Sequence, residues 1–230
     1  MVGPSRADAV VEFILSAIEA GTFRVGDQLP GESDLAELSG ASRLTVREAV
    51  KVLAAQRVLE VLQGRGTFVA PVEQWLSVDA LMRVQGANQA DVMGQLLDVR
   101  GYLEVGAAER FATLVTDEQL DQLRRHLSDM VEAHSREDVP RMVAADLAFH
   151  DVILNGCQNP FLIATLQPLA RSLVEARRET SKYGGIREHA IDEHRKVLLA
   201  LEARDRVAAR KAMRSHMRQT QRDTQVHFNR

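Results

Sequence analysis

Two neighbouring stretches decide the fold of the first part of the chain: SRLTVREAVKVLAA (residues 42–55) and VLEVLQGRGTFV (residues 58–69). In the first, apolar residues recur at helical spacing behind the N-cap residue Ser42, so we expect a helix from about Leu44 to Ala55. In the second, two β-prone runs flank a turn bounded by glycines, which is typical of a hairpin. The chain is therefore expected to run from a helix directly into a small β-hairpin.

Two further helices are expected before this pair. Residues 10–18 form an apolar helical stripe, and Ser33 is placed to cap a short helix that ends at Leu38. Helix, loop, helix, tight turn, helix and hairpin is the plan of a winged helix-turn-helix. Pro71 marks its edge, so we place this domain at residues 1–71.

The rest of the chain, residues 72–230, shows no convincing strand pattern. Helical stripes separated by Gly, Pro and Asn breakers predict helices at about 73–84, 89–114, 117–134, 138–156, 160–181, 186–203 and 205–227. The predicted fold class is thus mainly α, with an N-terminal winged helix-turn-helix and a C-terminal all-helical bundle.

Composition narrows the class of protein. The chain has 230 residues, of which 45% are hydrophobic and 27% charged, which is typical of a globular protein of one or two domains. A single cysteine excludes an intramolecular disulfide and fits a reducing cytosol. We expect a cytoplasmic protein without a secretory signal or membrane span, because the most apolar N-terminal stretch contains Glu12 and lacks a basic leader.

Charge is distributed unevenly although the net charge is only −3. The segment from Arg43 to Arg65 holds five Lys/Arg against two Asp/Glu. Arg43 and Arg47 are four residues apart at the start of the predicted helix, the end that reaches base edges when such a helix enters the major groove. Arg65, at the hairpin tip, can reach a phosphate or the minor groove. A second basic run, residues 204–222, is interpreted as a solvated helix face, with a nucleic-acid tail as the alternative.

Polar residues interrupt three apolar stripes of the helical part. Asp146 and His150 share one stripe, while His194 and His216 each lie on another. An inward histidine by itself is usually a hydrogen-bonded core residue. Three histidines with one aspartate favour a divalent metal instead, with Zn²⁺ first and Ni²⁺, Mn²⁺ or Fe²⁺ as alternatives.

Arg100 also lies on an apolar stripe, so its charge is aimed at the interior. A buried guanidinium needs an anion. Two kinds of anion could pair with Arg100: a protein carboxylate such as that of Glu104 or Asp146, or an organic-acid effector.

The chain resembles the GntR family of bacterial transcription regulators. Three motifs carry the resemblance in the N-terminal part: Leu29–Ala36, Ser42–Ala49 and Gly64–Val69. The resemblance implies DNA contacts from the predicted recognition helix and the wing, at Ser42, Arg43, Thr45, Arg47, Gly64 and Arg65.

The helical part resembles the FCD effector domain of the FadR-like branch of that family. Asp146-Leu147-Ala148-Phe149-His150, followed by His194 and His216, is similar to its D-x-x-F-H…H…H pattern. The resemblance implies a metal bound by Asp146, His150, His194 and His216, next to a small carboxylate effector.

These features favour a ligand-responsive transcription regulator over two alternatives. We expect a homodimer that reads a pseudo-palindromic DNA operator and responds to a small organic acid. The first alternative is a metal-dependent hydrolase fused to a DNA-binding head. It lacks a well-placed general base, because Glu193 and His194 point about 100° apart on a helix. The second is a structural metal site with constitutive DNA binding.

Overall fold

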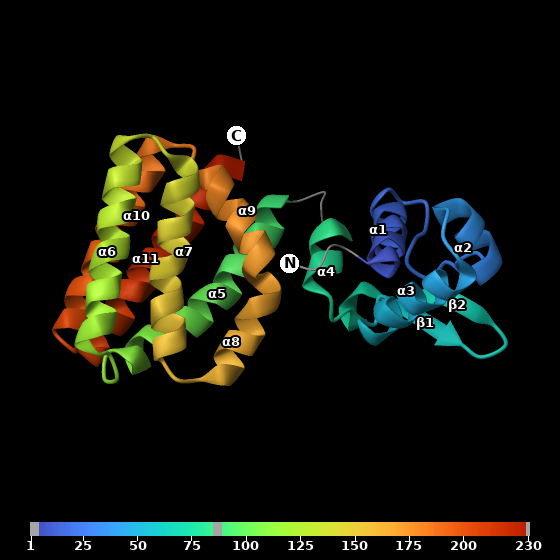
Figure 1. Ribbon diagram of the computed structural model, residues 1–230, viewed down its shortest axis with the longest axis horizontal. Coiled ribbons are helices and arrows are strands. Elements are labelled where there is room, and N and C mark those ends of the chain that lie inside the picture. Colours follow the sequence, from blue (N-terminus) through green and yellow to red (C-terminus); the bar gives the residue numbers. More distant parts are fainter. Residues whose placement is uncertain (1–4, 85–88, 229–230) are drawn as a thin grey trace. The chain divides into compact units, whose positions relative to one another are not determined.

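The computed structural model describes residues 5–84 and 89–228 (Figure 1). Contacts between residues divide the chain into two compact units, Met1–Asn88 and Gln89–Arg230. The described part of the chain contains no helix with the length and apolar character needed to cross a bilayer.

The first unit is a winged helix-turn-helix, with its elements in the predicted order. They are α1 (Arg6–Glu19), α2 (Glu32–Ser39), α3 (Arg43–Ala55), β1 (Leu59–Leu62) and β2 (Gly66–Val69). The two strands pair antiparallel, with Leu59 opposite Val69 and Leu62 opposite Gly66. Figure 1 shows the hairpin extending from the end of α3.

The core of this unit comes from the predicted apolar stripes. Val10, Ile14 and Ile18 of α1 are buried, as are Val46 and Leu53 of α3. Burying a side chain of this size contributes about 1.5–3 kcal/mol, so α3 is anchored along one face while its other face is left for solvent.

The predicted cap of α2 is wrong. Gly31, not Ser33, is the N-cap, and the backbone amide of Leu35 donates to the Gly31 carbonyl at 2.9 Å. The first helical hydrogen bond thus closes two residues earlier than expected, and Ser33 lies inside the helix.

Two short elements that follow Pro71 pack with the first unit. They are η1 (Val72–Gln74) and α4 (Val78–Val84). Trp75 and Ala80 belong to the same apolar core as α1 and α3, and Trp75 Nε1 donates to the Ala70 carbonyl at 2.9 Å. The contacts therefore divide the chain after residue 88 rather than at the edge that Pro71 suggests.

All elements of the second unit are helices in the described range 89–228, which agrees with the predicted bundle. They are α5 (Gln89–Phe111), α6 (Asp117–Ser135), α7 (Val139–Gly156), α8 (Pro160–Leu166), η3 (Gln167–Leu169), α9 (Ala170–Thr180), α10 (Gly184–Glu202) and α11 (Arg206–Phe228). In this bundle α5 packs against α11 and α6 against α7, while α10 contacts both α6 and α11.

The predicted helix over residues 160–181 is wrong as a single element. The chain forms α8, the short η3 and then α9, with Pro168 inside the break. Proline has no backbone N–H to donate, and its ring clashes with the carbonyl four residues earlier, so a straight helix cannot continue through it.

The inward stripe of α7 has the predicted composition. Asp146, His150, Ile153 and Cys157 are all buried. Cys157 follows the last residue of α7 and donates from Sγ to the Leu154 carbonyl at 3.1 Å. A helix that buries both apolar and ionisable groups on one face needs polar partners on its neighbours.

Candidate functional site

The predicted recognition helix α3 presents its basic residues to solvent. Ser42 is the N-cap and accepts from the backbone amide of Thr45 at 3.2 Å, and the two hydroxyls lie 2.8 Å apart. Arg43 and Arg47 are exposed. The N-terminal end of α3 therefore offers two guanidiniums and a hydroxyl pair from one surface.

Arg47 is already oriented by a partner on α2. Its Nε and Nη2 donate to the Glu32 carboxylate at 3.1 Å and 2.7 Å, and the hydrogen bond from Arg47 lowers the pKa of Glu32. Both side chains remain substantially exposed, so solvent screens the pair and it adds little to stability. Its effect is to hold the guanidinium in one orientation.

The wing depends on two glycines with left-handed backbone. Gly64 has φ +73° and Gly66 has φ +115°. A Cβ added at Gly66 would lie 2.4 Å from the Gln28 amide nitrogen, and that amide donates to the Arg65 carbonyl at 2.8 Å. Gln28 thus braces the turn that presents Gly64 and Arg65.

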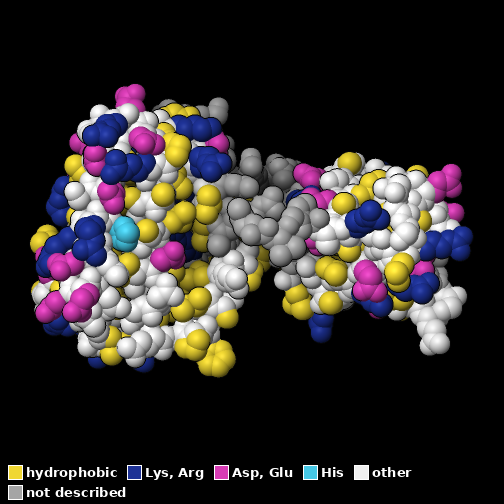
Figure 2. All heavy atoms as spheres, in the orientation of Figure 1, with side chains coloured by type: hydrophobic (Ala, Val, Ile, Leu, Met, Phe, Trp, Pro, Cys, Tyr) yellow, Lys and Arg dark blue, Asp and Glu magenta, His cyan; other side chains and the backbone are white. Residues whose placement is uncertain are grey.

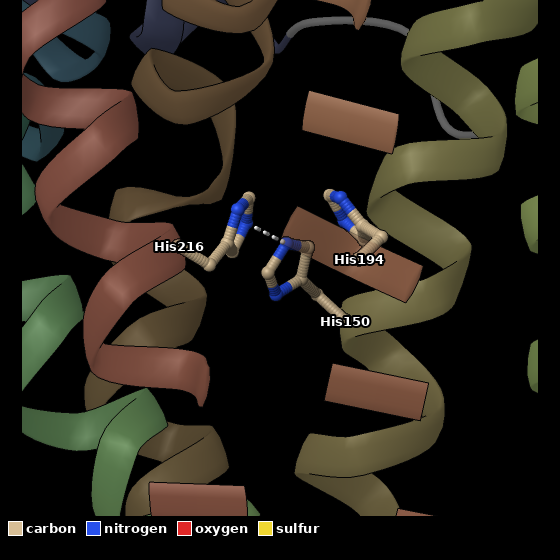
Figure 3. Close-up of side chains that lie close together, drawn as sticks. All are labelled: His150, His194 and His216. Carbon is tan, nitrogen blue, oxygen red and sulfur yellow. Dashed lines mark hydrogen bonds between the residues drawn. The ribbon is translucent and has the colours of Figure 1, made fainter. Parts of the chain in front are cut away.

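Three of the four predicted metal ligands meet in the interior of the second unit (Figure 3). One ring nitrogen from each of His150, His194 and His216 lies within 4.8 Å of the other two. The three rings come from α7, α10 and α11, and all are buried. His150 Nε2 and His216 Nε2 are 3.2 Å apart.

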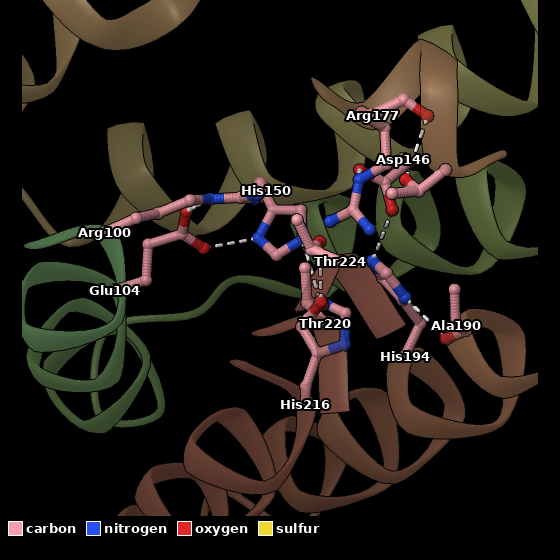
Figure 4. Close-up of polar contacts among 11 residues, drawn as sticks. Arg100, Glu104, Asp146, His150, Arg177, Ala190, His194, His216, Thr220 and Thr224 are labelled. Carbon is pink, nitrogen blue, oxygen red and sulfur yellow. Dashed lines mark hydrogen bonds and ion pairs between the residues drawn. The ribbon is translucent and has the colours of Figure 1, made fainter. Parts of the chain in front are cut away.

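The fourth, Asp146, lies beside this histidine cluster and also has a cationic partner. Its Oδ1 is 3.4 Å from His194 Nε2, while its Oδ2 is 2.8 Å from Arg177 Nε (Figure 4). Burial alone would raise the pKa of Asp146, but the Arg177 charge and the other positive groups around the carboxylate, among them Arg100, together outweigh burial and hold the pKa below its usual value. The carboxylate is therefore ionised, with one oxygen directed at the histidines.

Hydrogen bonding leaves acceptor lone pairs facing one another in this cluster. His194 Nδ1 lies 2.7 Å from the Ala190 carbonyl, which can only accept, so the proton is on Nδ1 and Nε2 carries a lone pair. That lone pair faces Asp146 Oδ1, and neither atom has a hydrogen-bond partner. Burial lowers the pKa of His194 to about 3 and that of His216 well below its usual value, so no proton fills the gap near neutral pH. The residues present fit a metal cation.

Arg100 pairs with a protein carboxylate, the first of its two expected partners. Its Nε pairs with Glu104 Oε1, and Glu104 Oε2 lies 2.5 Å from His150 Nδ1. Burial would raise the pKa of Glu104, but Arg100 and His150 together hold it well below its usual range. Glu104 thus links the guanidinium to a predicted metal ligand. A proton on Nδ1 leaves His150 Nε2 free for a metal.

A pocket of about 280 Å³ opens next to these residues. Its polar lining residues include Arg100, Glu104 and His150, as well as Asp151, Asn155 and Gln167, and apolar residues of α7, α8 and α9 form the rest. Figure 2 shows hydrophobic side chains gathered where α7 borders α8 and α9. A mostly apolar pocket with a few converging polar groups is the usual form of a small-ligand site.

Sequence reasoning missed Arg177, the partner of Asp146. Leu173, Arg177 and Thr180 are buried at helical spacing on α9. A helix predicted to begin after Pro168 would place these three residues on one face, and Arg177 would then be predicted to point inward. The ion pair between Glu32 and Arg47 joins two helices, and neither helix alone signals it.

The chain combines a winged helix-turn-helix with a helical unit that has buried polar residues and a pocket. This combination defines a class of protein: transcription regulators that join a DNA-binding domain to a ligand-binding domain. Two family models confirm this. The model "Bacterial regulatory proteins, gntR family" matches residues 6–69, and the model "FCD domain" matches residues 95–219. The chain belongs to the GntR family and carries an FCD domain.

Two relatives are similar to this chain over most of its length. It is 30% identical over 211 residues to the HTH-type transcriptional regulator LutR of Bacillus subtilis (strain 168), covering 87% of this chain and 92% of that protein. It is 27% identical to the galactonate operon transcriptional repressor of Escherichia coli (strain K12), covering 90% and 92%.

A solved structure is similar over nearly the whole length as well. The GntR protein of Streptococcus agalactiae is 28% identical, with a TM-score of 0.51 and coverage of 94% of this chain and 99% of that one. The family and these relatives are transcription regulators, so the chain is a ligand-responsive regulator and not an enzyme. This overturns the hydrolase alternative.

Proposed function

We propose that the sensor part of this regulator holds a divalent metal through His150, His194, His216 and Asp146. The observation that carries the proposal is the buried pair of acceptors, His194 Nε2 and Asp146 Oδ1, which face each other at 3.4 Å without a proton between them. Three imidazoles and a carboxylate suit Zn²⁺, and also Ni²⁺, Mn²⁺ or Fe²⁺. Such a metal, with positions left open, supplies a Lewis-acidic point at the inner end of the pocket.

The effector in this proposal is a small carboxylate metabolite bound in the pocket near the metal. Arg100 lines the pocket while its Nε is held by Glu104, so the guanidinium can bind an acid without leaving its protein partner. The relative named for the galactonate operon supports this chemical class, because galactonate is a carboxylate.

The winged helix-turn-helix of residues 1–71 reads the operator. The proposed DNA contacts are those of the exposed N-terminal end of α3 and the tip of the wing: Ser42, Arg43, Thr45, Arg47, Gly64 and Arg65. Arginine at the start of such a helix makes bidentate contacts to guanine, and the wing adds phosphate or minor-groove contacts.

The second part of the chain, which the sequence places at residues 72–230 and the residue contacts at Gln89–Arg230, binds metal and effector and forms a homodimer in this proposal. One small reader gives limited affinity, and two related by a twofold axis match a pseudo-palindromic site. The effector changes operator affinity only if it binds one arrangement of the dimer more tightly than the other.

A thermal-shift screen of small carboxylic acids on the full chain, after metal removal and after reloading, tests the sensor proposal. A ligand of the native state raises the melting temperature, so some acids should raise it only when metal is present. A His194→Ala variant is the control, since it should lose the metal and with it the response. Acids that act equally without metal, or none that act, would contradict the proposal.

Titration with operator DNA tests the proposed response to the effector, and sedimentation tests the proposed homodimer. The dimer predicts one sedimenting species of twice the chain mass, and operator affinity should change on addition of an acid from the screen. Affinity that ignores every acid that binds would favour a structural metal site with constitutive DNA binding.

A further inference from the structure

Arg177 has a buried donor that no protein atom satisfies. Its side chain is only 6% exposed, and its Nε pairs with Asp146. Its Nη2 is buried and has no hydrogen-bond partner. An unsatisfied buried donor destabilises a protein, and a charged one more so, and we therefore expect an acceptor here when a ligand is bound.

This donor lies on the opposite side of the histidine cluster from Arg100. Figure 4 shows Arg177 reaching in beside Asp146 and His194, whereas Arg100 and Glu104 lie beside His150. Leu173 lines the pocket, and Arg177 follows it by four residues on the same face of α9. Arg177 therefore continues the α9 wall of the pocket toward the histidines.

A second unsatisfied group lies on α11, the helix that carries His216 (Figure 4). Thr220 Oγ1 is buried without a hydrogen-bond partner, one turn after His216. A hydroxyl can donate or accept. Arg177 and Thr220 together provide what a carboxylate needs: a charged donor and a neutral one.

Charge balance decides how many carboxylates the ligand should carry. The buried charged side chains that pair with these histidines, or with a partner of these histidines, are Arg100, Arg177, Glu104 and Asp146, two of each sign, and the metal-bound imidazoles are neutral. Asp151 also lines the pocket but is exposed to water. The divalent metal of the proposed function therefore leaves two uncompensated positive charges, which are costly in a buried site.

We propose that the effector is a dicarboxylate, with one carboxylate on Arg100 and the other on Arg177 and Thr220. This inference rests on the proposed function and adds the chemical class of the ligand. A monocarboxylate would leave one positive charge without a counter-ion and one donor without an acceptor.

Calorimetric titration of the metal-loaded full chain tests the proposal. Malonate, succinate and glutarate are each compared with the monoacid of equal carbon number: propionate, butyrate and valerate. A charge-assisted hydrogen bond contributes about 1.5–3 kcal/mol, so at least one diacid should bind about tenfold more tightly than its monoacid. Arg177→Met should bring that ratio close to one. The matched control is Arg187→Met, which removes another buried arginine whose Nη1 donates to the Ser181 carbonyl at 2.8 Å, and it should keep the ratio.

Three results would overturn the proposal. If monoacids bind the wild-type protein as tightly as diacids do, the dicarboxylate proposal is wrong, while the proposed function stands. The same holds if the Arg177→Met variant keeps the preference for diacids. If that variant does not fold, Thr220→Val removes only the hydroxyl, and an unchanged ratio overturns the proposal. Failure of every acid to bind the metal-loaded wild type would instead contradict the proposed function itself.

Discussion

Replacing Glu104 by Gln should weaken metal binding although Glu104 is not itself a proposed ligand. The carboxylate is buried, lies 2.5 Å from His150 Nδ1 and pairs through its other oxygen with Arg100. It therefore fixes the proton of His150 on Nδ1 and turns Nε2 toward the cluster. Loss of such an outer partner typically costs about 10–100-fold in metal affinity, or roughly 1.4–2.8 kcal/mol. We expect the upper part of this range, since an amide also leaves Arg100 without its counter-charge.

The assay is competitive titration of Zn²⁺ against a chromophoric chelator, with circular dichroism to establish that the variant is folded. Glu193→Gln is the matched control. Glu193 is also largely buried and adjoins His194 in sequence, but it pairs with Lys196 at 2.5 Å. Its metal affinity should stay within about twofold of wild type, because the lost surface partner orients no ligand.

The result that refutes the reasoning is a folded Glu104→Gln chain whose Zn²⁺ affinity lies within about threefold of wild type. A second refutation needs no variant. Nitrogen-15 shifts of the metal-free protein should place the His150 proton on Nδ1, and a proton on Nε2 would contradict the orienting role.

Three further outcomes are expected. Arg47→Ala should weaken operator binding by about 1–3 kcal/mol in anisotropy titrations and reduce discrimination against a scrambled site, whereas Lys51→Ala should weaken both DNAs alike. In the metal-free protein, burial lowers the pKa of His194 to about 3, so the unfolded chain takes up the proton first. Stability should fall as pH drops below about 6.5, by about 2 kcal/mol at pH 5 from this group, measured by urea unfolding; a flat profile counts against it. Leu53→Ala, in the first core, should cost about 2–5 kcal/mol of unfolding free energy in the same assay.

Local periodicity was enough to predict which ligands face inward. Asp146 and His150 are four residues apart on a helix, so the turn geometry of α7 alone places both on its buried face. The same holds for His194 and His216 within their own helices. Convergence of three helices on one point does not follow from any single stripe; the combination of three inward histidines with an aspartate favours it, and the resemblance to the FCD domain implies it.

Side-chain contacts between different helices could not be predicted from the sequence. The Arg177 side chain contacts Asp146 from another helix, and Glu32 reaches Arg47 across the turn between α2 and α3. Such contacts depend on how helices pack, which residue spacing within one helix does not encode. The break at Pro168 is different, because the local rule for proline predicts it from the sequence alone, against the helical stripe that runs through it.

The burial of Cys157 has a practical consequence. It is the single cysteine of the sequence, and its thiol is buried and engaged with a backbone carbonyl. A thiol so enclosed reacts slowly with maleimides or methanethiosulfonates. One cysteine introduced at an exposed position of the wing, such as Val61, can therefore accept a spin label selectively in the otherwise natural sequence. In the proposed homodimer, distances between labels on the two copies would then show whether an acid changes the separation of the DNA-binding units.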